Sequence, residues 1–173
     1  MNLTAWCAGS IFAVLALHAC ASERAETGRL CSAQVELAEE LMSEQNWEAA
    51  LCESRRALIL GPTNQAARLI GLLSQVRLGR KPSGVLQELE AIAANADSPR
   101  LGAMAAYEAA RLLVESGDWT RAYEWLKLVF LRADDRDLFM KSGCTLSLLL
   151  KEHPELEPGN ADIRTRILTS EHL

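Results

Sequence analysis

Residues 44–52 read EQNWEAALC, and residues 57–62 continue as ALILGP. A polar turn with one large aromatic side chain is therefore followed by a segment with small residues at Ala50 and Ala57. The pair Gly61-Pro62 closes this segment, as is typical at the end of a helix. The segment predicts a turn and then a helix whose alanines let a neighbouring helix approach closely.

The same pattern occurs again at residues 116–126, which read SGDWTRAYEWL. Trp47 and Trp119 lie 72 residues apart (119 − 47), so two repeats of about 36 residues fit between them. A third turn of this kind, LGRK, lies at residues 78–81. Such a period predicts helical hairpins that stack on one another.

The composition also favours helices. Alanine and leucine are abundant, whereas aromatic residues make up only 5% of the 173 residues. A hydrophobic share of 49% with 24% charged residues is typical of a globular chain that can bury a core. The net charge of −5 gives no electrostatic support for nucleic-acid binding.

Helical periodicity and breakers predict three hairpins and a C-terminal pair of helices. The expected helices span residues 26–43, 48–60, 64–78, 83–95, two within 99–133, 136–152 and 161–170. The first of them carries two adjacent apolar stripes, Leu30–Ala33–Leu37–Leu41 and Cys31–Val35–Ala38–Met42.

The first hairpin resembles a tetratricopeptide repeat (TPR). The residues that match its pattern are Leu37, Ala38, Leu41, Ala50, Ala57 and Pro62, while Gln34 and Ser54 stand where the family has tryptophan and phenylalanine. The resemblance implies an all-α, right-handed helical-hairpin solenoid of about three TPR-like repeats over residues 30–135. Residues 136–173 would form a C-terminal helical cap.

The N-terminal residues 1–19 contain no Asp, Glu, Lys or Arg and include an apolar run. This layout is typical of a secretory signal peptide. The end of the run resembles a bacterial lipobox, which implies cleavage before Cys20, a lipid on Cys20 and a short tether over residues 20–29. Other outcomes stay open: ordinary cleavage after Ala21, which would release a soluble protein, a retained anchor, or a start of the protein at a different residue.

Five cysteines occur, at residues 7, 20, 31, 52 and 144. Cys31 and Cys52 are candidates for a disulfide in an oxidising compartment. In the expected hairpin, however, their positions differ by about five residues, or about 7 Å along the helix axis, from facing each other. A bridge between them is therefore the less favoured outcome.

The chain carries few signs of catalytic or cofactor chemistry. The three histidines lie in the leader and near the C-terminus, and no cysteine spacing is typical of zinc. We therefore expect no cofactor, no metal site and no enzymatic activity. A thiol-dependent enzyme acting through Cys52 or Cys144 is the weaker alternative.

The concave face of such a solenoid is the expected binding surface. Relatives that bind C-terminal carboxylates place basic residues there, whereas this chain has mostly apolar ones. The candidate groove residues are Val35, Glu39, Met42, Leu69, Leu73, Val76, Tyr107, Arg111 and Val114. This groove suits an apolar or amphipathic protein segment, unless the C-terminal helices of the chain fill it.

The sequence thus predicts a non-enzymatic protein-interaction scaffold, exported and tethered to a membrane on its periplasmic side by a lipid on Cys20. Its layout is similar to that of lipoproteins that help assemble outer-membrane proteins. A soluble periplasmic or secreted adaptor of the same fold is the alternative.

Overall fold

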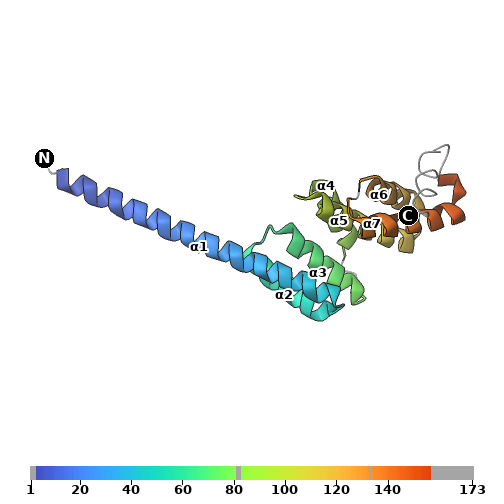
Figure 1. Ribbon diagram of the computed structural model, residues 1–173, viewed down its shortest axis with the longest axis horizontal. Coiled ribbons are helices and arrows are strands. Elements are labelled where there is room, and N and C mark those ends of the chain that lie inside the picture. The colour runs from blue at the N-terminus through green and yellow to red at the C-terminus, as the bar shows by residue number, and fades with distance from the viewer. Residues whose placement is uncertain (1–2, 81–82, 133, 157–173) are drawn as a thin grey trace. The chain divides into compact units, whose positions relative to one another are not determined.

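The computed structural model describes residues 3–80, 83–132 and 134–156, without the side chains of residues 3–21 and 132. These residues form α-helices and one short 3-10 helix, with no strand among them, so the fold is all-α (Figure 1). The expected final helix at 161–170 lies outside the described residues. The chain divides into two compact units, Met1–Gly79 and Arg80–Leu173.

The first unit contains α1 (Leu3–Ser43), α2 (Trp47–Leu60) and α3 (Gln65–Arg77). Consecutive helices pack against each other, and α1 also contacts α3. The helix α1 is longer than the expected span of 26–43, and its N-terminal part continues beyond α2 and α3 (Figure 1). Residues 20–29, predicted as a tether, are therefore helical, because they are rich in the helix formers Ala, Glu and Arg and contain no proline.

One of the two apolar stripes of α1 is buried in the core, whereas of the other stripe Leu41 alone packs partly against it. Cys31, Val35 and Ala38 are buried, whereas Leu30 and Leu37 are 50% and 40% exposed. The buried stripe packs with four residues of the next two helices, Ala50, Ala57, Ala67 and Ile70. Ala38, Ala50 and Ala57 have no exposed surface, as the hairpin pattern predicts.

Ser54, which stands where the TPR pattern has phenylalanine, is fully buried, and its hydroxyl donates to the Leu51 carbonyl at 2.9 Å. A Cβ added to Gly71 would lie 3.2 Å from the Ser54 Oγ atom. The small side chain at position 54 therefore leaves room for the close approach of α3. The departure from the family pattern has a packing reason.

The turn between α1 and α2 is closed by local hydrogen bonds. Gln45 adopts a positive φ of 61°, and the Asn46 N–H donates to the Leu41 carbonyl at 2.9 Å. The Asn46 side chain then accepts from the Ala49 N–H and caps α2. At the far end of α2, the Gly61 N–H donates to the Ala57 carbonyl at 2.8 Å.

The second unit contains α4 (Val85–Asn95), α5 (Pro99–Ser116), α6 (Trp119–Arg132), α7 (Arg136–Glu152) and η1 (Pro154–Leu156). Each helix packs against the next, and α5 also contacts α7. The boundary between the units falls inside residues 64–95, which the sequence predicts as one hairpin. Its first helix, α3, belongs to the first unit, and α4 packs against α5 in the second.

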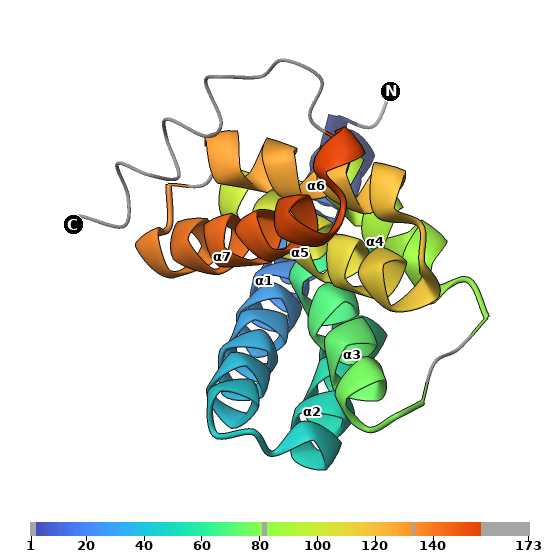
Figure 2. The same cartoon turned by 90° about the vertical axis from the view of Figure 1, so that its right-hand side faces the viewer.

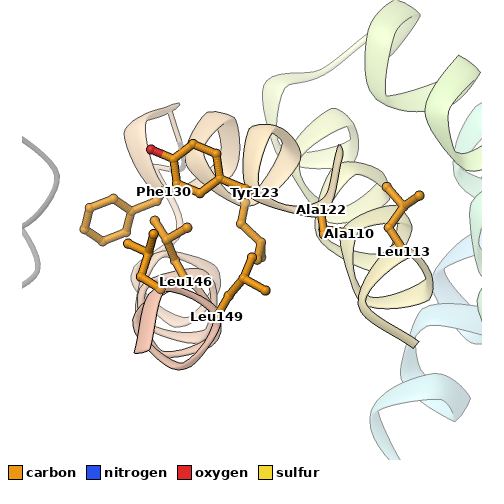
Figure 3. Packing of buried hydrophobic residues seen from close by; sticks show 9 residues of the cluster. Ala110, Leu113, Ala122, Tyr123, Phe130, Leu146 and Leu149 are labelled. Atoms are coloured by element: carbon orange, nitrogen blue, oxygen red, sulfur yellow. The ribbon is translucent and has the colours of Figure 1, made fainter. Parts of the chain in front are cut away.

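The main core of the second unit lies between α5, α6 and α7, which run side by side (Figure 2). Figure 3 shows side chains of α6 and α7 that meet there, among them Phe130, Leu146 and Leu149. Ala110 and Ala122 lie at the crossing of α5 and α6 and have no exposed surface. Their positions correspond to the small residues that the repeated pattern places at a helix crossing.

Candidate functional site

Six of the predicted groove residues belong to the first unit. Val35, Leu69 and Leu73 are buried, Met42 and Val76 are half-buried, and Glu39 is exposed. Val35 is part of the core between α1, α2 and α3. The three buried residues are therefore packing residues in this structure and do not line an open groove.

The other three belong to α5, where α7 covers the predicted surface. Tyr107 and Val114 pack against the core cluster that contains Leu146 and Leu149 of α7. The Tyr107 hydroxyl lies 3.5 Å from the Thr145 hydroxyl of α7. In this unit the structure places the helix 136–152 against the face that the sequence assigns to a partner.

Arg111 is not an isolated cation on that face. Its guanidinium donates to the Glu108 carboxylate at 2.7 Å and lies 3.9 Å from the Glu115 carboxylate. Glu108 is buried, so this pair on one face of α5 balances a charge that would otherwise be costly to bury. Because the three residues lie on α5, these are contacts within one helix.

A different hollow lies in the second unit, where the end of α4 and the start of α5 meet the end of α6. Its volume is about 330 Å³. Small and aliphatic residues line most of it: Ala93, Ala94, Ala96, Ser98, Pro99, Gly102, Ala103, Ala106, Leu128 and Val129. We call this the alanine groove. A ligand there would meet mainly apolar atoms of short side chains.

Gly102 lies where α4 and α5 approach each other closely at the alanine groove. A Cβ at this position would lie 3.3 Å from both the Ala93 carbonyl oxygen and the Ala96 Cβ. The two helices therefore approach closely, and the short side chains around them leave a depression. The run of small residues in 93–106 is the sequence signal for this groove, which the repeat pattern alone did not single out.

A second hollow of about 510 Å³ adjoins the alanine groove and shares Ser98, Pro99 and Ala103 with it. Its polar rim is formed by the starts of two helices. Ser98 caps α5 through the Leu101 N–H at 3.2 Å, and Asp135 caps α7 through the Asp137 N–H at 2.9 Å. Both polar side chains are thus used for helix capping.

One helical turn before its groove residues Ala93 and Ala94, α4 is tied to α6 by Glu90. The Glu90 carboxylate accepts from the Arg121 guanidinium at 2.5 Å and from the Trp125 indole N–H at 3.1 Å. The charge of Glu90 raises the pKa of Arg121 above its usual value. These contacts fix α4 on α6 and position one wall of the alanine groove.

The three cysteines with described side chains are free thiols. Cys31 is buried and donates to the Ala57 carbonyl at 3.4 Å, whereas Cys52 and Cys144 are exposed. The less favoured Cys31–Cys52 bridge is therefore not formed. Cys20 lies on α1, but its side chain is outside those that the structure describes.

His153, the one histidine with a described side chain, is engaged in structural contacts. Its ring stacks on Trp119 with centroids 4.7 Å apart, and its Nδ1 atom lies 3.0 Å from a Glu155 carboxylate oxygen. It also ends α7, since its N–H donates to the Leu149 carbonyl. These contacts link the end of α7 to the start of α6.

Within the described part of the chain, no group of His, Cys, Asp and Glu is arranged to hold a metal ion. No helix among those residues is both long and apolar enough to span a bilayer. Comparison of the chain with protein-family models, with curated proteins and with solved structures finds no match.

Proposed function

We propose that this protein is a non-enzymatic scaffold that binds other proteins. The observation that carries this proposal is that the helices form hairpins which leave an apolar hollow, the alanine groove, accessible on the second unit. Apolar surface bordered by polar residues is typical of interaction sites, and apolar grooves can accept an amphipathic segment of another protein. The pKa values of Arg121 and Lys141 are raised because each side chain forms an exposed ion pair, so these shifts have a structural cause.

The finer architecture is part of the same proposal. The hairpins α1–α2 and α5–α6 would be TPR-like repeats in a right-handed solenoid of about three, with α7 and the following residues as a cap. Support comes from their matching features: a capped turn before a tryptophan, and alanines without exposed surface at the crossing. Repeat proteins of this kind present surfaces for partner proteins.

We further propose that the protein is exported and carries a lipid on Cys20. The uncharged residues 1–19 and the small residues around Cys20 support this proposal. A lipid anchor would hold the scaffold at the periplasmic surface of a membrane, where it could take part in assembly of envelope proteins. The soluble adaptor remains the alternative.

Replacing Cys20 with serine should abolish incorporation of a labelled fatty acid and move the protein from the membrane to the soluble fraction. The reason is that only a thiol at this position can receive the lipid. Intact mass of the mature wild-type protein provides the second measurement, and Cys52→Ser, which changes an exposed cysteine elsewhere, is the control. Labelling and fractionation that the substitution leaves unchanged would contradict a lipid on Cys20.

The proposed ligand of the alanine groove is an apolar or amphipathic segment of another protein. The short side chains around Ala103 leave space for larger aliphatic or aromatic side chains. At the rim, the Arg100 Nε atom lies 3.7 Å from the Asp135 carboxylate, so polar groups of the same segment would find both charges nearby. An amphipathic helix or an extended segment satisfies both conditions.

A photo-reactive benzoylphenylalanine at position 103 should form a discrete covalent adduct with one partner protein in cells. Ala103 lines both hollows and is half-buried, so a partner seated there would lie within reach. The matched control places the same amino acid at Ala91, an exposed alanine of α4 outside the hollows. Identical adduct patterns at both positions, or none at 103, would contradict the proposed binding site.

A further inference from the structure

The outward face of α7 carries a self-complementary strip of side chains. Its five members, all exposed, are Asp137, Met140, Cys144, Leu148 and Lys151. They are spaced by three, four, four and three residues, so they follow one stripe of the helix. We call this set the α7 strip.

The α7 strip carries more apolar side chains than is usual for the solvent-facing side of a helix. Leu148 is 63% exposed and Met140 is 40% exposed, although the opposite face of α7 is already used for the core through Leu138, Leu146, Leu149 and Leu150. Cys144 lies between these two apolar side chains and is an exposed free thiol. The helix therefore has one apolar face inside the unit and a second, narrower one outside.

The charges at the two ends of the strip indicate what covers it. Asp137 lies seven residues before Cys144, and Lys151 lies seven residues after it. If two copies of α7 pack antiparallel with Cys144 opposite Cys144, then Asp137 of each copy faces Lys151 of the other. Met140 of each copy likewise faces Leu148 of the other.

The flanking charges follow the same symmetry. Arg136 and Glu152 are both exposed and lie eight residues before and after Cys144. A parallel arrangement would instead place Asp137 against Asp137 and Lys151 against Lys151. Antiparallel pairing is therefore the arrangement that the charges favour, and it is a two-fold symmetric contact in which both copies use the same surface.

We propose that the α7 strip is a homodimer interface, with a second copy of this chain as its occupant. Two helices of 17 residues, each about 25 Å long, give a contact at the small end of specific interfaces. The dimer should therefore dissociate on dilution. This inference does not depend on the alanine groove or on a lipid anchor.

A charge-swap series measured by analytical ultracentrifugation of the full chain tests the proposal. Asp137→Lys and Lys151→Asp should each weaken the dimer about tenfold, because each replaces two attractive pairs with two repulsive ones. The double variant Asp137→Lys/Lys151→Asp restores opposite charges at both ends and should dimerise again. The loss of the Asp137–Lys141 ion pair occurs in both the single and double Asp137 variants, so it cannot explain the restoration.

Cross-linking with a short bismaleimide tests whether the two copies meet at Cys144, where the proposed two-fold axis passes. A covalent dimer should form in the wild type and in Cys52→Ser, and it should be lost in Cys144→Ser. The proposal would be overturned if the chain stayed monomeric at all concentrations, since the strip would then be covered by residues of its own chain. A dimer that is insensitive to the swaps, or that the double swap does not restore, would do the same.

Discussion

Replacing Ala50 with glutamate should lower the free energy of unfolding of the first unit by about 3–5 kcal/mol, or prevent this unit from folding. Ala50 has no exposed surface and lies in the core where α1, α2 and α3 meet. A larger side chain must push the helices apart, and its carboxylate would be buried among Ala38, Ala57 and other apolar groups. Both effects act in the same direction.

Hydrogen exchange of the α2 amides is the appropriate measurement, because a chain of two compact units need not unfold in one step. The matched control is Ala33→Glu, which places the same side chain on the exposed face of α1. We expect the control to change stability by less than about 0.5 kcal/mol. An equally small change in Ala50→Glu would contradict the position of Ala50 at the crossing.

The helices that the sequence predicts most accurately are those with chemical signals at both ends. The bounds of α7 agree with the prediction, since Asp135 caps its start and His153-Pro154 follows its last turn. The predicted start of the third hairpin at residue 99 also agrees with α5, which begins at Pro99 after its cap Ser98. The last residue of α5 is Ser116, and Gly117 follows it with a positive φ of 81°. Local chemistry is sufficient for such boundaries.

The choice between the two stripes of α1 depends on a contact far along the chain. Leu37 matches the TPR pattern and is more hydrophobic than Cys31, yet Leu37 is exposed and Cys31 is buried. A Cβ on Gly61 would lie 2.8 Å from the Cys31 sulfur, so that glycine leaves the space in which Cys31 fits. Residues 31 and 61 are too distant in sequence for helical periodicity to relate them.

The candidate site likewise depends on contacts between residues that are distant in sequence. Tyr107 and Val114 lie on the predicted face of α5, but whether that face is open depends on the placement of α7, which packs against it. The sequence left both outcomes open, and the structure favours the filled one for these residues. The alanine groove depends on three helices together, so no single helical pattern reveals it.

Replacing Phe130 with alanine should lower the free energy of unfolding of the second unit by about 3–5 kcal/mol. Phe130 is 1% exposed and belongs to the cluster between α5, α6 and α7. Its ring stacks on that of Phe139, with the centroids 4.5 Å apart, so the substitution would remove a ring contact as well as leave a cavity. Hydrogen exchange of α6 and α7 measures the loss, with Leu131→Ala at the neighbouring exposed position as the control.

Gly143 lies against the ring of Phe130 and provides a second test of how this ring is packed. Alanine in place of a helical glycine normally stabilises a helix by about 1 kcal/mol, yet a Cβ here would lie 2.9 Å from the Cε2 atom of Phe130. We therefore expect Gly143→Ala to destabilise the second unit, by about 1–3 kcal/mol. In a Phe130→Leu background the colliding ring atoms are gone, so the same substitution should become neutral or stabilising. A loss of equal size in both backgrounds would mean that Gly143 is required for a reason other than the ring of Phe130.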